Sequence, residues 1–277
     1  IAALEKIDSE YLERYVARFW QSASAEIMLY GNYDDDSAAD IAAMVAKIIP
    51  ESKAPALPDL KVLKLAANEQ LQYAVDVPHD DAVVAWYLQG AGNTWEDQAA
   101  TALTGQIMKS GFFQQLRTEQ QLGYVVSAFS WPQHDVPGLV MLVQSPVADA
   151  SAVASAMEQF MQGVVPDLDE AQFVRHRKAL VNEILRPDKN MWERAEFYWQ
   201  SIARKQWDFD GRQSLAAAVE KLTLESWRDY YQGVFLEQRH ALQVVAPGKT
   251  GKLPQGDMRR YDSAEAIKAD HPVYIID

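Results

Sequence analysis

Residues 111–127 read GFFQQLRTEQQLGYVVS, and this stretch decides how the rest of the chain is interpreted. It places an arginine, Arg117, and a tyrosine, Tyr124, seven positions apart, with polar residues and then Gly123 between them. A glycine gives the backbone a conformational freedom that other residues lack. The run 124–126, Tyr-Val-Val, is aromatic and β-branched, which is typical of the start of a strand. The stretch therefore predicts a helix-to-strand junction that presents a guanidinium and a phenol from neighbouring elements.

Both side chains are hydrogen-bond donors suited to a polarised carbonyl group. Arginine is a rigid cationic fork, and tyrosine is a neutral O–H donor with an ordinary pKa of about 10. The spacing alone fits a second interpretation, a solvated arginine near a half-buried tyrosine. The residues around the pair decide between the two.

Those residues follow the pattern Phe-Phe-x-x-Leu-Arg-Thr-x-x-Gln-Leu-Gly-Tyr over 112–124. The pattern resembles, almost letter for letter, a segment in the C-terminal half of the pitrilysin and insulin-degrading enzyme family. Members of this family are zinc metallopeptidases with the inverted ligand motif H-x-x-E-H. The resemblance implies that a peptide substrate lies in a closed chamber between two halves. It also implies that Tyr124 donates its O–H to the oxyanion at the scissile carbonyl, while Arg117 holds a neighbouring backbone carbonyl.

The family's zinc motif is missing from this chain. None of the histidines has a partner histidine at i+4 or an H-x-x-E-H setting, and there is no cysteine to supply a thiolate. We therefore predict no metal ligand here. The resemblance implies that Zn²⁺, its ligands and the general base belong to the N-terminal half of the full-length enzyme, so this chain alone is expected to be inactive. The histidines considered are His79, His134, His176, His240 and His271.

Charge and hydropathy restrict the partners. With 26 basic against 39 acidic side chains, the net charge of −13 argues against nucleic acid, because phosphate binding needs clustered Lys and Arg. No apolar run approaches the ~18 residues of a membrane span, so no membrane partner is expected. The resemblance implies two partners, peptide substrates and the N-terminal zinc-binding half of the same protein. The compartment is not identified; the resemblance implies the periplasm, where bacterial relatives often occur.

The chain divides into two predicted parts. Residues 1–59 are expected to be the C-terminal end of a preceding, third domain: a helix, a buried strand over 25–33, a second helix and a Pro-rich linker over 50–59. Because the chain opens on Ile1 rather than Met, it is expected to be a piece of something longer. Residues 60–277 are expected to form a complete fourth domain, and the resemblance runs over essentially the whole chain.

The second part is predicted to be α+β, with helices packed on a mostly antiparallel sheet. Strands at 61–67 and 70–77 are expected to form a hairpin, and 81–89 follows without a crossover helix. Thr94 and Asp97 form a capping box that opens a helix. Further strands are expected at 123–130, 138–144 and 241–246, with helices between them, and 249–277 is expected to loop over the surface.

Two non-enzymatic alternatives remain open at this point. The same fold serves in scaffolding subunits, such as the core subunits of respiratory complexes, and the chain is also compatible with a free-standing peptide-binding module. The Arg117 and Tyr124 pair favours the peptidase, because a scaffold has no use for an oxyanion donor. An H-x-x-E-H motif with a further glutamate ligand upstream in the gene would separate the peptidase from the scaffold.

Overall fold

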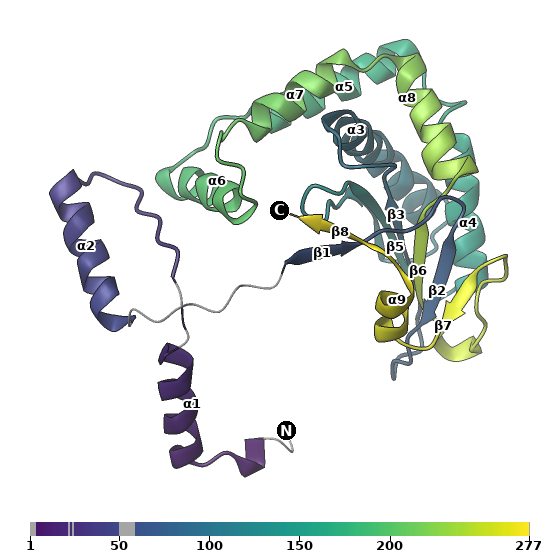
Figure 1. The fold of residues 1–277 in the computed structure, drawn as a ribbon. Helices are drawn as coiled ribbons and strands as arrows, with labels where there is room; N and C mark the ends of the chain where they lie inside the picture. The colour runs from purple at the N-terminus through teal and green to yellow at the C-terminus, as the bar shows by residue number, and fades with distance from the viewer. Residues whose placement is uncertain (1–3, 22, 24, 50–58, 277) are drawn as a thin grey trace. The chain divides into compact units, whose positions relative to one another are not determined.

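The computed structural model describes residues 4–21, 23, 25–49 and 59–276 (Figure 1). By internal contacts the chain forms two units. The first comprises Ile1–Asp59 and Asp188–Lys205, and the second comprises Leu60–Pro187 and Gln206–Asp277. Apart from Asp59, the linker predicted at 50–59 lies outside the described residues. Among the helices that are described, none has the length and apolar character of a membrane span.

The first unit is helical. Asp34 begins its second helix, since its carboxylate accepts the backbone N–H of Ser37 at 2.8 Å. The strand predicted over 25–33 is wrong, because those residues have no regular structure. A strand needs a partner for its backbone groups, and the described residues of this unit include no other strand. The elements are η1 (Leu4–Lys6), α1 (Ser9–Gln21), α2 (Asp35–Ile48) and α6 (Met191–Ala203).

The second unit is built on a six-stranded sheet with the order β4-β5-β3-β6-β2-β7. Three neighbouring pairs are antiparallel, and the two pairs that involve β2 are parallel. The predicted α+β class with a mostly antiparallel sheet is confirmed. The strands are β2 (Gln70–Ala74), β3 (Ala82–Gln89), β4 (Val125–Ser130), β5 (Gly138–Ser145), β6 (Ala241–Ala246) and β7 (Arg259–Tyr261).

The hairpin predicted from 61–67 and 70–77 is wrong. β1 (Leu60–Leu63) pairs instead with β8 (Val273–Ile276), near the other end of the chain. The side chain of Gln89 explains why β1 leaves β2: it donates to the carbonyl of Leu63 at 2.8 Å and accepts the N–H of Leu65 at 2.9 Å. Backbone groups that a hairpin would pair are thereby satisfied by a side chain.

The expectation that 249–277 only loops over the surface is also wrong. This segment contains β7, a short helix α9 (Ala264–Asp270) and β8. α9 contributes Ile267 to a small core with Leu65, Leu71 and Tyr261. The C-terminal segment lacks a long periodic pattern, but its pairing with β1 and β2 gives it regular structure.

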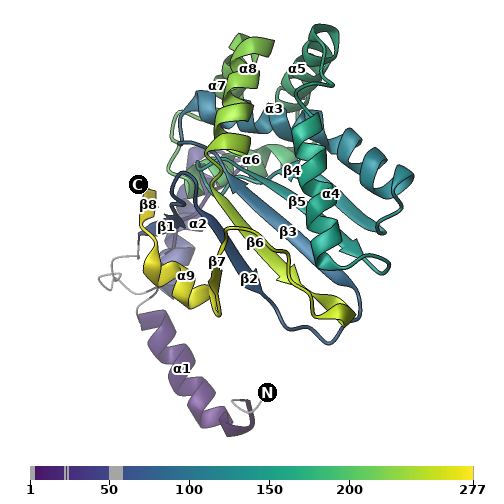
Figure 2. The same ribbon diagram turned by 90° about the vertical axis from the view of Figure 1, so that its right-hand side faces the viewer.

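Apart from α9, the helices of this unit lie on one face of the sheet (Figure 2), whereas α9 packs against Leu71 and Leu242 on the other face. α3 and α4 contact the strands directly, and α5 and α7 pack on α3 or on each other. Thr94 caps α3 through the predicted capping box with Asp97. On the opposite face, alternate residues such as Tyr87 and Leu142 remain half-buried. The helices are α3 (Trp95–Phe112), α4 (Ala150–Gly163), α5 (Glu170–Ile184), α7 (Gly211–Lys221) and α8 (Leu224–Tyr230), with π-helical segments η2 (Phe113–Glu119) and η3 (Tyr231–Glu237) and a 3₁₀ turn η4 (Gly248–Thr250).

A salt bridge joins α4 to the segment before β6. Arg239 holds both carboxylate oxygens of Glu158, at 2.7 and 2.9 Å, while its guanidinium lies over the ring of Trp86 at 5.3 Å. The arginine side chain is only 8% exposed and that of Glu158 is 39% exposed. The hydrogen bonds from Arg239 hold the pKa of Glu158 below its ordinary value. Losing the carboxylate therefore leaves a buried cation uncompensated.

Glu158→Gln is expected to lower the free energy of unfolding by about 2 kcal/mol at neutral pH. Because the folded-state pKa of Glu158 is depressed, its contribution is present above the unfolded-state pKa and disappears as pH falls through the folded-state value. The gap between wild type and variant should therefore narrow in acid, which urea unfolding at several pH values measures. Asp80→Asn is the control: its bridge to Lys249 at 3.8 Å is exposed, so a change within about 0.5 kcal/mol is expected. A difference in unfolding free energy between wild type and Glu158→Gln that does not depend on pH would contradict the salt bridge between Glu158 and Arg239.

Candidate functional site

The predicted helix-to-strand junction is confirmed. α3 continues without a break into η2, and the chain then turns into β4. The backbone N–H of Gln120 donates to the carbonyl of Gln115 at 3.0 Å, and that of Leu122 donates to Leu116 at 2.9 Å. Gln121 takes the left-handed conformation, with φ of 52°, that ends the helical turn. π-helical turns of this kind are frequent at functional sites.

Gly123 serves this junction by its lack of a side chain. Its φ is not in the left-handed region, which at this turn is occupied by Gln121 instead. A Cβ atom built on Gly123 would lie 1.9 Å from the carbonyl oxygen of Gln144 in β5. The backbone entering β4 thus passes directly against β5, and only glycine leaves room for that approach. This contact determines the position of the next residue, Tyr124.

Tyr124 is held by two polar side chains, one just before β3 and one in β5. Its hydroxyl donates to Asp81 Oδ2 at 3.2 Å and accepts from Gln144 Nε2 at 2.5 Å. Gln144 Nε2 also donates to Asp81 Oδ2 at 3.0 Å, which closes a triangle of polar groups. The tyrosine is 53% exposed, whereas the Asp81 side chain is only 13% exposed. The phenol is therefore fixed in position and remains accessible.

The surroundings keep this phenol protonated. Partial loss of hydration raises the pKa of Tyr124 above its ordinary value of 10.0, and the charge of Asp81 and the hydrogen bond to it act in the same direction. Gln144 opposes the shift by donating to the hydroxyl. A raised pKa means that the hydroxyl keeps its proton well above neutral pH, so it remains an O–H donor.

Asp81 and Gln144 were not predicted from the sequence as site residues. They lie 43 and 20 positions from Tyr124, so no local pattern connects the three. His79 adjoins the triangle, with Nδ1 accepting the backbone N–H of Asp81 at 3.0 Å and lying 3.8 Å from its Oδ1. The only sequence signal was the polar segment 79–81 at the start of a predicted strand.

Arg117 lies on η2 and is exposed. Its guanidinium lies 4.9 Å from the centre of the Phe113 ring, one helical turn away, which orients the side chain by a cation–π contact. η2 and β4 contact each other, so the arginine and the tyrosine stand on adjoining elements. Neither side chain points into the core. The roles given to them from the sequence remain predictions.

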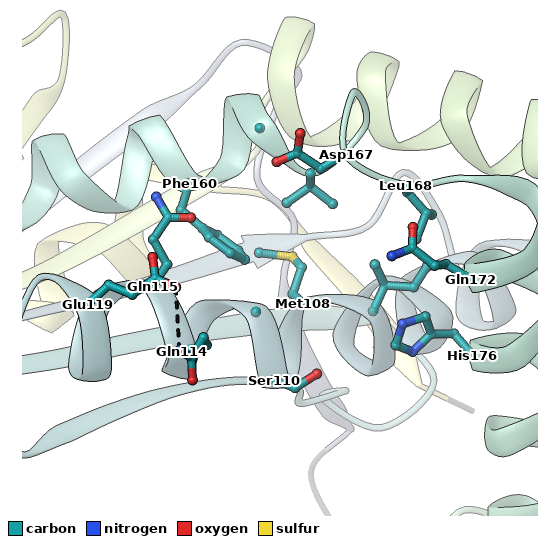
Figure 3. Close-up of a pocket in the computed structure, with 14 residues that line it drawn as sticks. Met108, Ser110, Gln114, Gln115, Glu119, Phe160, Asp167, Leu168, Gln172 and His176 are labelled. Carbon is teal, nitrogen blue, oxygen red and sulfur yellow. Dashed lines mark hydrogen bonds between the residues drawn. The ribbon is translucent and has the colours of Figure 1, made fainter.

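A pocket of about 350 Å³ lies between α3, η2, α4 and α5 (Figure 3). Glu119 and Asp167 give it an acidic rim, and a 3.4 Å hydrogen bond joins Gln114 to Glu119. Burial and the nearby charge of Arg175 lower the pKa of His176, which also lines it. Neither Arg117 nor Tyr124 belongs to this pocket, so it is separate from the predicted peptide contacts.

The described residues contain no group of three or more His, Cys, Asp or Glu side chains that fits a metal ion. Two of the histidines make structural contacts. His240 Nδ1 lies 3.0 Å from the carbonyl of Leu65, and His271 bridges the Ile267 carbonyl and the Glu69 carboxylate. The residues present therefore do not fit the family's zinc ion, and no step of chemistry is assigned to a metal held by this chain.

Asp81→Asn is expected to move the pKa of Tyr124 back toward its ordinary value. The carboxylate raises that pKa both by its charge and as a hydrogen-bond acceptor, and an amide removes the charge. The measurement is a pH titration by NMR of protein labelled with ¹³C at tyrosine Cζ, with Tyr124 assigned through Tyr124→Phe. Asp80→Asn, an adjacent exposed carboxylate, serves as the control. A Tyr124 titration that is identical in wild type and Asp81→Asn would show that the triangle does not form in solution.

Comparison with known proteins identifies the fold first. Pitrilysin matches with a TM-score of 0.88 at 21% sequence identity, over 99% of this chain and 30% of that one. A domain from Pseudomonas fluorescens described as a peptidase M16 inactive domain matches with a TM-score of 0.59 at 14% identity, over 82% of this chain and 54% of that one. The chain thus has the α+β fold of the pitrilysin-type metallopeptidases.

The sequence comparisons show which family the chain resembles. The insulin-degrading enzyme of Drosophila melanogaster is 25% identical over 256 residues, which are 87% of this chain and 26% of that protein. A family model described as PQQ synthase PqqF-like, C-terminal lobe domain 4, matches residues 103–199. The resemblance to the pitrilysin and insulin-degrading enzyme family is confirmed, and it is to the C-terminal half. The chain spans about a quarter of the length of the relatives it matches.

Proposed function

We propose that this chain is the C-terminal, non-zinc part of a pitrilysin-like zinc endopeptidase that degrades peptides. The observation that carries the proposal is the Tyr124 hydroxyl, which Asp81 and Gln144 hold in place although the residue is 53% exposed. It lies in the stretch with the most specific family resemblance. A neutral donor fixed before any charge develops is what stabilisation of an oxyanion requires.

In the proposed complex the peptide carbonyl replaces Asp81 as the acceptor of the hydrogen bond that the Tyr124 hydroxyl donates. Gln144 continues to donate to the phenol oxygen, so the ring keeps its position when the acceptor changes. A hydroxyl that already donates to a carboxylate is oriented for an acceptor that gains negative charge. Arg117 holds a neighbouring peptide carbonyl and fixes the register of the substrate, with its side chain oriented by the ring of Phe113.

The catalytic zinc ion, its ligands and the general base are proposed to come from the N-terminal half of the same protein. Within the described part of this chain no set of side chains fits a metal ion. The chain is accordingly proposed to close the substrate chamber and to contribute contacts to the peptide backbone. It is proposed to cleave nothing by itself.

Arg117→Ala is expected to weaken the binding of a fluorescein-labelled basic peptide to this chain by roughly 10–150-fold, since it removes a charge-assisted hydrogen bond worth about 1.5–3 kcal/mol. Fluorescence anisotropy gives the affinity. The control is Arg175→Ala, which removes the same charge from an exposed position on α5. Because the protein carries a net charge of −13, general attraction for a basic peptide affects both variants equally. Equal affinities for the two variants would contradict the assignment of Arg117.

A non-catalytic scaffolding subunit is the second candidate. The similarity to a domain described as inactive favours it, although that match is one of fold alone. A scaffold does not require an accessible phenol with two polar supports. Unchanged peptide affinity in both Arg117→Ala and Tyr124→Phe would favour the scaffold, as would an upstream gene region without an H-x-x-E-H motif.

A further inference from the structure

The pocket between α3, η2, α4 and α5 plays no part in the proposed function, because neither Arg117 nor Tyr124 lines it. Its volume of about 350 Å³ lies within the range of small-molecule sites, which is ~300–1,000 Å³. Much of its lining is apolar, and the side chains of Phe160 and Met108 face it (Figure 3). The buried apolar residues that line it are Ile107, Met108, Phe160, Val164 and Leu168.

Two glycines keep this pocket open. Gly111 in α3 and Gly163 at the end of α4 both line it. Neither has a φ in the left-handed region, so the backbone does not require glycine at either position. A Cβ atom on Gly111 would lie 3.5 Å from the ring of Phe160, and one on Gly163 would lie 3.6 Å from Asp167 Oδ2. Alanine would therefore fit at both positions, and it is the better helix former. What the two glycines supply is the space itself.

The ionisable groups that line the pocket give it negative charge. Within the described part of the chain, the carboxylate of Glu119 accepts one weak hydrogen bond, from Gln114 at 3.4 Å, and that of Asp167 has no partner. Burial and the charge of Arg175 lower the pKa of His176, so its imidazole is neutral at neutral pH. Among the described residues that line the pocket there is no lysine or arginine. Two carboxylates without a cationic partner thus border an apolar interior.

We propose that this pocket binds a small organic cation, a primary ammonium group carried on an apolar body. The carboxylates of Glu119 and Asp167 attract the ammonium group, and the apolar body packs on Phe160 and Met108. The ring of Phe160 adds to the attraction, because the face of an aromatic ring is electronegative. The same two carboxylates repel anions of similar shape. This second site does not depend on the proposed function.

Three probes that share one body and differ in charge test the proposal: phenethylammonium, phenethyl alcohol and hydrocinnamate. The NMR signal of the His176 imidazole, assigned through His176→Gln, reports occupancy because this ring lines the pocket. Phenethylammonium should shift the signal saturably and bind roughly fivefold more tightly than the alcohol, as expected for a cation near exposed carboxylates. Hydrocinnamate should bind most weakly. Equal affinities for the three probes, or no shift of the signal at any concentration of phenethylammonium, would overturn the proposal.

Two charge-removing variants locate the carboxylates that act on the cation. Glu119→Gln and Asp167→Asn should each weaken the binding of phenethylammonium by roughly two- to fivefold and leave that of the alcohol unchanged. The losses should shrink at high salt, which screens exposed charges. The control is Asp80→Asn, which removes an exposed carboxylate that does not line the pocket and should change neither affinity. The same phenethylammonium affinity in all three variants would refute the role of the two carboxylates.

Gly111→Leu tests the space that the glycine leaves. Its side chain would enter the pocket beside Phe160, so phenethylammonium and the alcohol should both bind roughly tenfold more weakly or worse. Leucine is a good helix former at this exposed position, so the midpoint of thermal unfolding should not fall. If Gly111→Leu fails to fold, Gly111→Ala decides: its methyl group has room, and it should weaken both probes by roughly fourfold. Unchanged affinity in the folded variant would overturn the proposal.

A lysine or arginine side chain of a bound peptide is the competing occupant of the pocket. The fluorescein-labelled basic peptide described above separates the two, with the His176 signal again as the reporter. A response to phenethylammonium that this peptide does not reproduce supports the small-molecule site. If the peptide shifts the signal at concentrations well below those of the amine, and Glu119→Gln weakens that response, the pocket belongs to a peptide side chain and the proposal is wrong.

Discussion

If the proposed function is right, Tyr124→Phe is expected to lower the turnover number for peptide cleavage by about 10²–10³-fold in the protein that joins this chain to the proposed zinc-binding half. The substitution removes only the hydroxyl that Asp81 and Gln144 hold in position. Stabilisation of an oxyanion acts in the transition state, so the loss should appear in kcat, with KM little changed. Steady-state cleavage of a fluorogenic peptide measures both constants.

The matched control is Tyr11→Phe, which removes the hydroxyl of another exposed tyrosine, on α1. It should leave both constants within about twofold, as expected for a surface change of under ~0.5 kcal/mol. A normal kcat in Tyr124→Phe would show that the Tyr124 hydroxyl takes no part in catalysis. A rise in KM alone would reduce it to a contact that binds the ground state and the transition state equally.

Gly123→Ala is expected to have the largest effect on stability, lowering the free energy of unfolding by about 3 kcal/mol. The new methyl group would meet the backbone oxygen of Gln144, 1.9 Å from the ideal Cβ position. A backbone atom of a paired strand cannot move aside as a flexible side chain does. The entry of β4 must therefore shift, and Tyr124 shifts with it. Urea unfolding measures the loss.

Gly233→Ala is the control for this prediction. Gly233 also lies in the second unit, within η3, and a Cβ atom there would have no other atom within 4 Å. Alanine has the higher helix propensity, so this variant should be neutral or more stable by up to ~1 kcal/mol. Similar stability in Gly123→Ala and in wild type would mean that β4 does not pass against β5 as described.

Much of the fold could be predicted because its signals are local. The capping box at Thr94 and Asp97 marks the start of α3 from four consecutive residues. The apolar run before Gln89 identifies β3 by its composition. The junction from η2 to β4 is predicted by the alternation of apolar, polar and glycine residues within 111–127.

The rest depends on contacts between residues far apart in the chain. From the sequence, β1 resembles one half of a hairpin. In the structure, the side chain of Gln89 satisfies the backbone groups of Leu63 and Leu65 that the hairpin would have paired. β8, its true partner, lies near the other end of the sequence and has no strong pattern of its own. The site residues divide in the same way. Arg117 and Tyr124 belong to one local motif and could be predicted, whereas Asp81, which contacts Tyr124, lies 43 positions away in the sequence and could not.

We propose that this chain completes a peptidase centre whose metal it does not hold. The most direct measurement is zinc-dependent cleavage of a fluorogenic peptide by the purified chain, by the zinc-binding half, and by the two mixed. We expect no cleavage by this chain at any zinc concentration, and restored cleavage in the mixture that is lost again with Tyr124→Phe. Zinc-dependent cleavage by this chain alone would contradict the account, and so would a zinc-binding half that is equally active without it.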